Sequence, residues 1–384
     1  MPHTEKEKHH SFGRTILSFG RGQAPSMDTT HSSTSSLDSE LESFQRLVSD
    51  HFAALSSVHS DDVLTFSWLH NLLDAFVSCH DHFMLILSKN KLQLSNSPMD
   101  KFTSDYFERS VKALDICNAA QDGIGVIQQW EKHLEIVVCA LDPQNKTLSE
   151  GKFRRAKKAL MEMALDMLDD KDTRASFSHR NRSYGGKKDH QRHPSSHSRS
   201  LSWSVSPSWS ASKQLHSIAN HLIPPRGSEI SFSNGLVVPV FTMSFVLLFV
   251  LWVLVAALPS QDRNLQIHFT IPRQFPWGNA IGLLHEQIME ASKKERNNSH
   301  GLLKEIIQTE KCSRHMTSVI DSAQFPLSDE QKRETEQGVA ELAFACESLK
   351  KGLQSLERQV RDIFRKIMNC RIEGLGMLDK PNLL

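Results

Sequence analysis

The sequence has little of what β-rich folds need. Among its 384 residues there are only 2 tyrosines, with 17 glycines and 14 prolines. A β-sandwich or barrel needs many tight turns, which use glycine and proline, and aromatic residues in its strands. These counts therefore predict helices rather than strands.

The cysteine count and the net charge are also low. Six cysteines, none of them in a CxxC pair, are too few for a disulfide framework and favour a reducing compartment. The 45 Lys and Arg residues balance 44 Asp and Glu residues, which leaves a formal net charge of +1 and excludes a globally basic nucleic-acid-binding protein. Hydrophobic residues make up 39% of the chain. Compact domains have roughly 45–50%, so we expect sizeable unfolded stretches.

Catalytic motifs are missing as well. The chain contains no GxGxxG, GxxxxGK[ST], GxSxG or HExxH. The densest group of metal-ligand residue types surrounds His80 and His82, which on a helix point about 200° apart and cannot share an ion. A carboxylate metal site in a bundle would need Glu-x-x-His pairs, and the one match, Glu7–His10, lies in the polar N-terminal segment. We therefore expect no enzyme activity, no cofactor, no metal and no small-molecule substrate.

What the sequence does contain is helical periodicity. Apolar residues at steps of three and four predict a series of amphipathic helices. Two glycines, Gly123 and Gly125, fall inside the third and predict a kink or break, because each costs about 1 kcal/mol relative to alanine. The expected helices start at Asp38 or Ser39 and then cover roughly Val63–Lys89, Ser104–Leu141, Ser149–Leu168, Asn279–Lys294, Leu302–Phe325 and Asp329–Met377.

Composition divides the chain into five segments. The predicted fold class is all-α: a helical bundle with long antiparallel helices, one strongly hydrophobic central helix, and a disordered N-terminus and linker. In order, the segments are a disordered N-terminal segment (1–37), an N-terminal helical bundle (38–170), a basic Ser-rich linker (171–212), a hydrophobic helix (236–258) and a C-terminal helical region (277–378).

The hydrophobic helix is long enough to cross a bilayer. Leu236–Leu258 holds 23 residues without a charge. Its helical length of about 34 Å exceeds a hydrocarbon core of about 30 Å. We expect it to insert into a membrane, with Leu236, Phe245, Leu248, Trp252 and Leu258 in the membrane segment. The alternative is a helix fully buried inside a soluble bundle, although such helices usually keep a polar stripe.

Topology is not fixed by flanking charge. Arg226 on one side of the segment and Arg263 and Arg273 on the other are too evenly balanced to orient it. Three cysteines (Cys312, Cys346 and Cys370) and the bundle-type amphipathicity of both halves favour a cytosolic C-terminal half. We therefore expect Asn297, which lies in a glycosylation sequon, to stay unmodified and the three thiols to stay free.

The last helix carries the most regular apolar seam. Its apolar residues alternate steps of three and four over more than four heptads. A dimeric coiled coil would use this pattern, but we favour a long helix packed within its own chain. The seam residues are Val339, Leu342, Cys346, Leu349, Leu353, Leu356, Val360, Ile363, Ile367 and Cys370.

Two polar features suggest regulation. A basic cluster is a candidate for anionic lipid, a solvated helix face or nucleic acid. No groove-reading fold or stacking aromatics accompany it, so we expect no nucleic-acid partner. Ser202, which follows Arg199 by three residues, and Ser206, which precedes Pro207, are phosphorylation candidates in the linker. The basic cluster consists of Lys152, Arg154, Arg155, Lys157 and Lys158.

Several blocks in the same order resemble the plant BYPASS/ROH family of helical proteins. The match runs from about Leu41 to Leu378. The blocks are LESFQRLVSDHFAAL (Leu41–Leu55), FSWLHNLLDAFVSCHDHF (Phe66–Phe83), RSLSWSVSPSWSASKQL (Arg199–Leu215), LVAALPSQDR (Leu254–Arg263), IPRQFPW (Ile271–Trp277) and VAELAFACESLKKGLQSLERQVRDIFRKI (Val339–Ile367).

The resemblance implies a non-enzymatic protein with a hydrophobic central segment. Some members of the family are linked to polarised secretion through Exo-seventy-type subunits of the exocyst, and others to growth signalling. We therefore expect a membrane-associated interaction or regulatory protein on the cytoplasmic face of the plasma membrane or an endomembrane, with a protein partner. The alternative is a soluble cytosolic scaffold whose hydrophobic segment is a buried core helix.

Overall fold

The computed structural model describes residues 31–142, 148–178, 211–220, 222–259, 270–295 and 301–378. Within these ranges the chain forms eleven α-helices and no β-strand, which confirms the predicted all-α class. They are α1 (His31–Ser56), α2 (Phe66–Lys89), α3 (Lys91–Leu94), α4 (Met99–Leu141), α5 (Glu150–Ser178), α6 (Ala211–Ala219), α7 (Gly227–Phe232), α8 (Val237–Ala257), α9 (Gly278–Glu295), α10 (Lys304–Ser322) and α11 (Asp329–Leu378).

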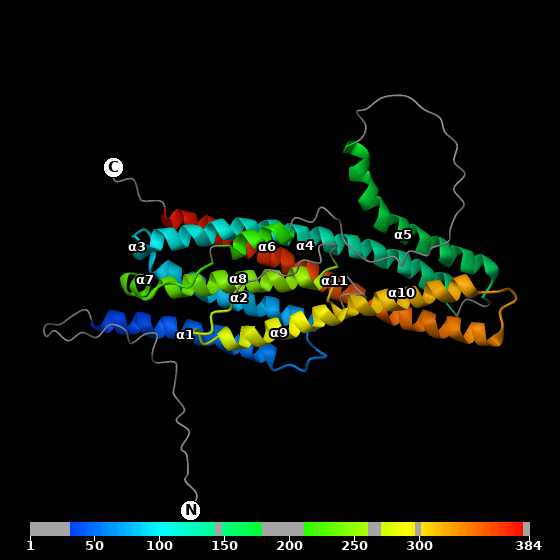
Figure 1. Ribbon diagram of the computed structural model, residues 1–384, viewed down its shortest axis with the longest axis horizontal. Helices are drawn as coiled ribbons and strands as arrows, with labels where there is room; N and C mark the ends of the chain where they lie inside the picture. Colours follow the sequence, from blue (N-terminus) through cyan, green and yellow to red (C-terminus); the bar gives the residue numbers. More distant parts are fainter. Residues whose placement is uncertain are drawn as a thin grey trace, which may run out of the picture.

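The helices form an elongated bundle with α8 inside one half (Figure 1). Helices α4 and α11 run antiparallel along its length, and their side chains meet at several points: Gln128 Nε2 donates to Glu357 Oε2 at 3.1 Å, and Lys350 bonds to Glu135. In the other half, α4 and α11 are accompanied by α5 and α10. One hydrophobic core extends from Leu41 on α1 to Cys370 on α11, so residues before and after α8 share it.

Local sequence explains where the helices begin. Thr65 caps α2, because its Oγ1 accepts a hydrogen bond from the N–H of Trp68 at 3.2 Å. Helix α11 begins with a reciprocal cap, in which the N–H of Gln331 donates to Ser328 Oγ at 3.1 Å and the N–H of Ser328 donates to Gln331 Oε1 at 3.2 Å. These caps fix the starts of α2 and α11 independently of the apolar pattern.

The apolar seam of α11 is buried within the chain. All ten predicted seam residues are at most 4% exposed. Polar contacts hold the same helix to α2: Gln359 Nε2 donates to the carbonyl of His70 at 3.0 Å and to Asp74 Oδ1 at 2.7 Å. The helix therefore packs within its own chain, which is the arrangement that we favoured over a dimeric coiled coil.

Several boundaries differ from those expected from the sequence. Helix α4 runs through Gly123 and Gly125 without interruption, since its many buried neighbours outweigh the cost of two glycines. Helix α1 begins at His31, and α5 continues to Ser178, into the expected linker. The short helices α3, α6 and α7 were not expected, because segments of four to nine residues carry too few repeats to display a period.

Candidate functional site

Helix α8 lies in the centre of its half of the bundle. All 21 of its residues are buried, and the five residues expected to mark a membrane segment (Leu236, Phe245, Leu248, Trp252 and Leu258) are each at most 2% exposed. Aromatic side chains of other segments cover it: the ring of Phe52 on α1 meets that of Phe249 edge-on at 5.8 Å. In the described residues, α8 is the one helix long and apolar enough to span a membrane.

The polar side chains of α8 bond to protein groups. Gln45 Nε2 on α1 donates to Thr242 Oγ1 at 3.0 Å, and Trp277 Nε1 donates to Gln45 Oε1 at 2.9 Å. Ser244 Oγ donates to the carbonyl of Val240 one turn back at 2.8 Å. Thus both hydroxyls of this otherwise apolar helix have hydrogen-bond partners within the protein.

The C-terminal end of α8 is also satisfied by the protein. The N–H groups of Leu302 and Leu303 donate to the carbonyls of Ala256 and Ala257 at 3.1 and 3.2 Å. The approach needs a glycine: a Cβ at Gly301 would lie 2.7 Å from the nitrogen of Pro259. The segment just before α10 therefore supplies donors to carbonyls that a helix end leaves unpaired.

The basic cluster lies on the outer side of α5. Arg154 and Arg155 are exposed, while Lys152 is half-buried. Three ion pairs involve the cluster: Arg154 pairs with Glu150 at 2.8 Å, Lys158 with Glu162 at 3.6 Å and Lys157 with Asp321 of α10 at 2.8 Å. Exposed ion pairs of this kind are weak. Arg154 and Lys158 share one helical stripe with Met161 and Leu165, which are 57% and 52% exposed.

The phosphorylation candidates Ser202 and Ser206 and the sequon residue Asn297 lie outside the described residues. The six cysteines all lie within them and are free thiols. Burial raises the pKa of Cys79, Cys117, Cys346 and Cys370 to about 12. These thiols therefore stay protonated at neutral pH, unlike nucleophilic cysteines.

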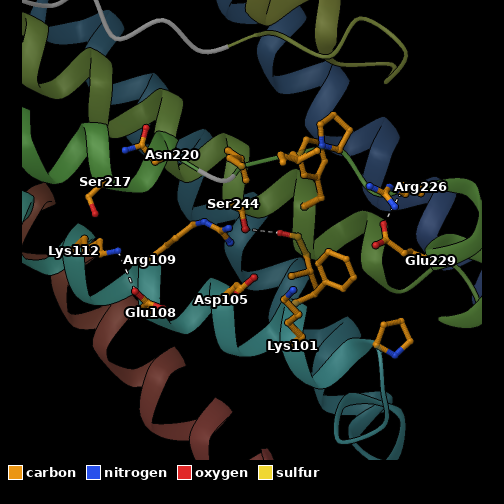
Figure 2. A pocket seen from close by; sticks show the side chains of 17 residues that line it. Lys101, Asp105, Glu108, Arg109, Lys112, Ser217, Asn220, Arg226, Glu229 and Ser244 are labelled. Atoms are coloured by element: carbon orange, nitrogen blue, oxygen red, sulfur yellow. Dashed lines mark hydrogen bonds and ion pairs between the residues drawn. The ribbon is translucent and has the colours of Figure 1, made fainter.

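A buried glutamate and a buried histidine also have strongly shifted pKa values. Glu131 on α4 is 4% exposed, and burial, with repulsion from Glu135 one turn away, raises its pKa to about 7. Burial lowers the pKa of His80 on α2 to about 4, so its ring is neutral at pH 7. Neither residue lines the large cavity of Figure 2, which lies elsewhere on α4.

That cavity, of about 750 Å³, opens between α4 and the segment from α6 to α8 (Figure 2). Its volume lies within the roughly 300–1,000 Å³ range of ligand pockets. The charged lining residues are four cations (Lys101, Arg109, Lys112 and Arg226) and three acids (Asp105, Glu108 and Glu229). The remaining lining residues are Pro98, Phe102, Ser217, Asn220, Leu222, Ile223, Pro224, Val240, Phe241 and Ser244.

The charged wall of the cavity comes mainly from one stripe of α4. Lys101, Asp105, Arg109 and Lys112 follow one another at helical steps of four, four and three, which places them on one face. Lys112 Nζ bonds to Glu108 Oε1 at 3.1 Å. Arg109 is half-buried, and burial lowers the pKa of its guanidinium, an effect that nearby Asp105 opposes.

The sequence pattern alone did not reveal this cavity. The stripe from Lys101 to Lys112 was a usable signal, because cations and acids repeat there with a helical period. The opposite wall depends on residues 222–226, which have no periodicity and lie against α4 only in the folded chain. The predicted α5 cluster and this cavity are separate features of the surface.

The family model and the individual relatives that match the chain point to the same family. Residues 1–378 match the family described as Protein ROH1-like. The chain is 48% identical to Protein ROH1D of Arabidopsis thaliana over 396 aligned positions, covering 99% of each chain. It is 32% identical to Protein ROH1A of the same plant, covering 89% of this chain and 90% of the relative. A shorter match, 25% identical over 114 residues and 29% of this chain, joins it to Protein BPS1, chloroplastic. No solved structure matches the chain.

Proposed function

Because the chain belongs to the ROH1-like family of plant proteins, we propose that it is a non-catalytic interaction or regulatory protein, a helical scaffold built around α8 as its core helix. The observation that supports this most is the set of partners around α8. Its 21 residues are all buried, its hydroxyls are paired, and Leu302 and Leu303 donate to its last carbonyls. A helix inserted in lipid would leave the covering faces of α1, α2 and α4 without their apolar partner.

A second candidate is a single membrane span formed by α8. It is favoured by the length of the helix, since 21 uncharged residues extend for about 31 Å, close to the roughly 30 Å of a hydrocarbon core. This candidate requires the helix to leave the bundle, because every one of its side chains is covered in the folded chain.

Replacing Leu248 by Arg separates the two candidates. Leu248 is 0% exposed, so a buried charge should unfold the protein, with loss of helical circular dichroism and aggregation. Leu92 is 90% exposed, and the same replacement there should leave the fold intact. The wild-type chain should be released from membranes by alkaline carbonate. A carbonate-resistant wild type, with a Leu248→Arg variant that becomes soluble and stays helical, would establish the membrane span instead.

We further propose that the scaffold works at the cytoplasmic face of a membrane through the outer side of α5. The stripe of Arg154, Lys158, Met161 and Leu165 combines cations with exposed apolar side chains, a pattern typical of anionic lipid surfaces. Each cation near such a surface contributes about 1 kcal/mol, so Arg154 and Lys158, together with the neighbouring exposed Arg155, contribute about a hundredfold in affinity.

Vesicle sedimentation tests this attachment. Full-length protein should bind vesicles containing 30 mol% phosphatidylserine and be released by added salt. Changing Arg154, Arg155 and Lys158 to Gln should abolish binding, whereas the same change at three exposed cations of α11 (Lys351, Arg358 and Arg365) should preserve it. Equal loss in both triple variants would place the attachment outside α5, and no binding by the wild type would favour a cytosolic protein.

As a protein partner we propose an Exo-seventy-type exocyst subunit, as the family resemblance implies, with a role in polarised secretion or growth signalling. The exposed side of α11 offers Phe344, which is 80% exposed, and aromatic side chains are enriched at the centres of protein interfaces. Proximity labelling with the intact chain should enrich such a subunit, and Phe344→Asp should reduce the enrichment without changing the circular dichroism. Absence of the subunit from the labelled proteins would contradict the proposed partner.

A further inference from the structure

The cavity beside α4 has an apolar floor formed by the central helix. Val240 and Phe241 of α8 are 2% and 5% exposed, yet both line the cavity. Phe102 of α4 adds a third apolar side chain, and Ile223, 72% exposed, stands at its rim. An apolar group placed here would contact the small exposed parts of Val240 and Phe241 and would mainly cover Phe102 and Ile223, which are more exposed.

The charged wall faces the same space. In Figure 2 the Arg109 side chain extends from α4 toward the side of the cavity where Ser244 of α8 lies. Two of the acidic lining residues are engaged: Glu108 bonds to Lys112 at 3.1 Å, and Glu229 Oε2 accepts from the backbone N–H of Arg226 at 2.7 Å. The third acid, Asp105, lies one helical turn from both Lys101 and Arg109. With all three acids counted, the lining still keeps an excess of one positive charge, because it has four cations. An acidic group near Arg109 and Lys101 therefore meets net positive charge beside an apolar floor.

We propose that this cavity binds an amphipathic anion, a ligand with an apolar body on Val240 and Phe241 and one acidic headgroup at Arg109 and Lys101. The guanidinium holds the headgroup by charge-assisted hydrogen bonds, and the floor of α8 accepts the apolar body. Since α8 supplies the floor, the proposal rests on α8 lying in the bundle core.

A fluorescent fatty acid provides the probe. cis-Parinaric acid should bind the full-length wild-type protein saturably, with a dissociation constant on the order of 1 μM. Its methyl ester, which has the same apolar body and no charge, should bind at least about tenfold more weakly. Displacement by oleate or by 1-oleoyl lysophosphatidate distinguishes a carboxylate ligand from a phosphate ligand, and displacement by neither would contradict the proposal.

Two variants locate the site. Arg109→Gln should reduce the difference between acid and ester to less than about threefold, because it removes the charge and leaves the apolar floor. Ser217→Trp places a large ring at a half-buried lining position of α6 and should abolish binding of both probes. Arg358→Gln, the same change at an exposed position of α11, should behave as wild type.

The outcomes that overturn the proposal are specific. Wild-type protein that is soluble and helical yet binds no parinarate would refute the ligand while leaving α8 in the core. Acid and ester bound equally by the wild type would refute the anionic headgroup. Unchanged discrimination in Arg109→Gln, with folding confirmed by circular dichroism, would refute the assigned position. Carbonate resistance of the wild type would instead refute the position of α8 in the bundle core, and with it the scaffold on which this cavity depends.

Discussion

The ring of Phe107 on α4 occupies the space where a methyl group on Gly374 of α11 would lie. A Cβ added to Gly374 would stand 1.8 Å from Cζ of that ring. Phe107 is 2% exposed, so its ring has no space into which to move. Nearby, Arg371 Nη1 donates to the Phe107 carbonyl at 2.6 Å, which holds the same two turns together. Glycine is therefore the residue that lets α11 approach α4 here.

Replacing Gly374 by Ala should destabilise the protein. Overpacking a buried contact typically costs about 1–3 kcal/mol, more than the roughly 1 kcal/mol that alanine gains over glycine in a helix. Gly125 in α4 is the matched control, because a Cβ there would meet nothing within 4 Å. Gly125→Ala should stabilise by up to about 1 kcal/mol in urea unfolding. If both variants move the midpoint in the same direction, the Phe107 contact is not a constraint.

The buried seam of α11 predicts that substitutions at two neighbouring positions differ strongly in their effect on the free energy of unfolding. Leu353 is 0% exposed, and Leu353→Asp should destabilise by several kcal/mol, because it buries a charge without a partner. Glu357 lies one turn on at the edge of the seam, where it bonds to Gln128 and Arg361. Glu357→Ala should cost at most about 1 kcal/mol. Thermal unfolding of both variants measures this difference, and equal losses would contradict the buried seam.

The shifted pKa of Glu131 makes stability depend on pH. Its carboxyl titrates at about 7 in the folded protein, above the ordinary value of 4.5, so the folded state binds more protons between these values. Stability from this group is therefore full below about pH 4.5 and falls as pH rises to about 7. Glu131→Gln keeps the neutral form at every pH. It should unfold at higher urea concentration than wild type at pH 8, with the difference shrinking at pH 5.

Contacts between the two halves of the chain predict one compartment for both. Lys157 of α5 pairs with Asp321 of α10 at 2.8 Å, and the rings of Phe153 and Phe325 meet edge-on at 5.3 Å. A chain spanning a bilayer once at α8 would separate these partners. Asn297 should therefore carry no glycan in plant cells. A mobility shift that endoglycosidase removes, and that Asn297→Gln abolishes, would instead place the C-terminal half in a lumen.

Most of the helices could be predicted from the spacing of apolar residues, because long helices repeat their pattern many times. The period identified α2, α4 and α10 and all ten buried seam residues of α11. It could not separate a buried core helix from a membrane span for α8, since both surroundings select the same apolar residues. The place of α8 in the bundle depends on long-range contacts such as those of Gln45 and Leu302, which no local pattern contains.

The α5 cluster and the cavity were harder to predict from the sequence. The α5 cluster was visible as a run of charges, but its ion pair with Asp321 depends on how α10 packs. The cavity was not visible, because Arg109 lies on a charged stripe that resembles any solvated helix face. Its ligand-binding character depends on the apolar floor at Phe241, more than a hundred residues further along the chain.

The hydrogen bonds from Leu302 and Leu303 to the last carbonyls of α8 have a consequence for synthesis of the protein. Leu302 and Leu303 leave the ribosome after α8, and the seam of α11 follows later still. At roughly 5–20 residues per second, translation from Leu258 to Leu378 takes on the order of 10 s. During that time a fully apolar helix lacks part of its covering, although α1, α2 and α4 are already made. We therefore expect that a nascent chain in which the N-terminal helices enclose this segment slowly would present an apolar helix long enough to enter a membrane before α10 and α11 are made.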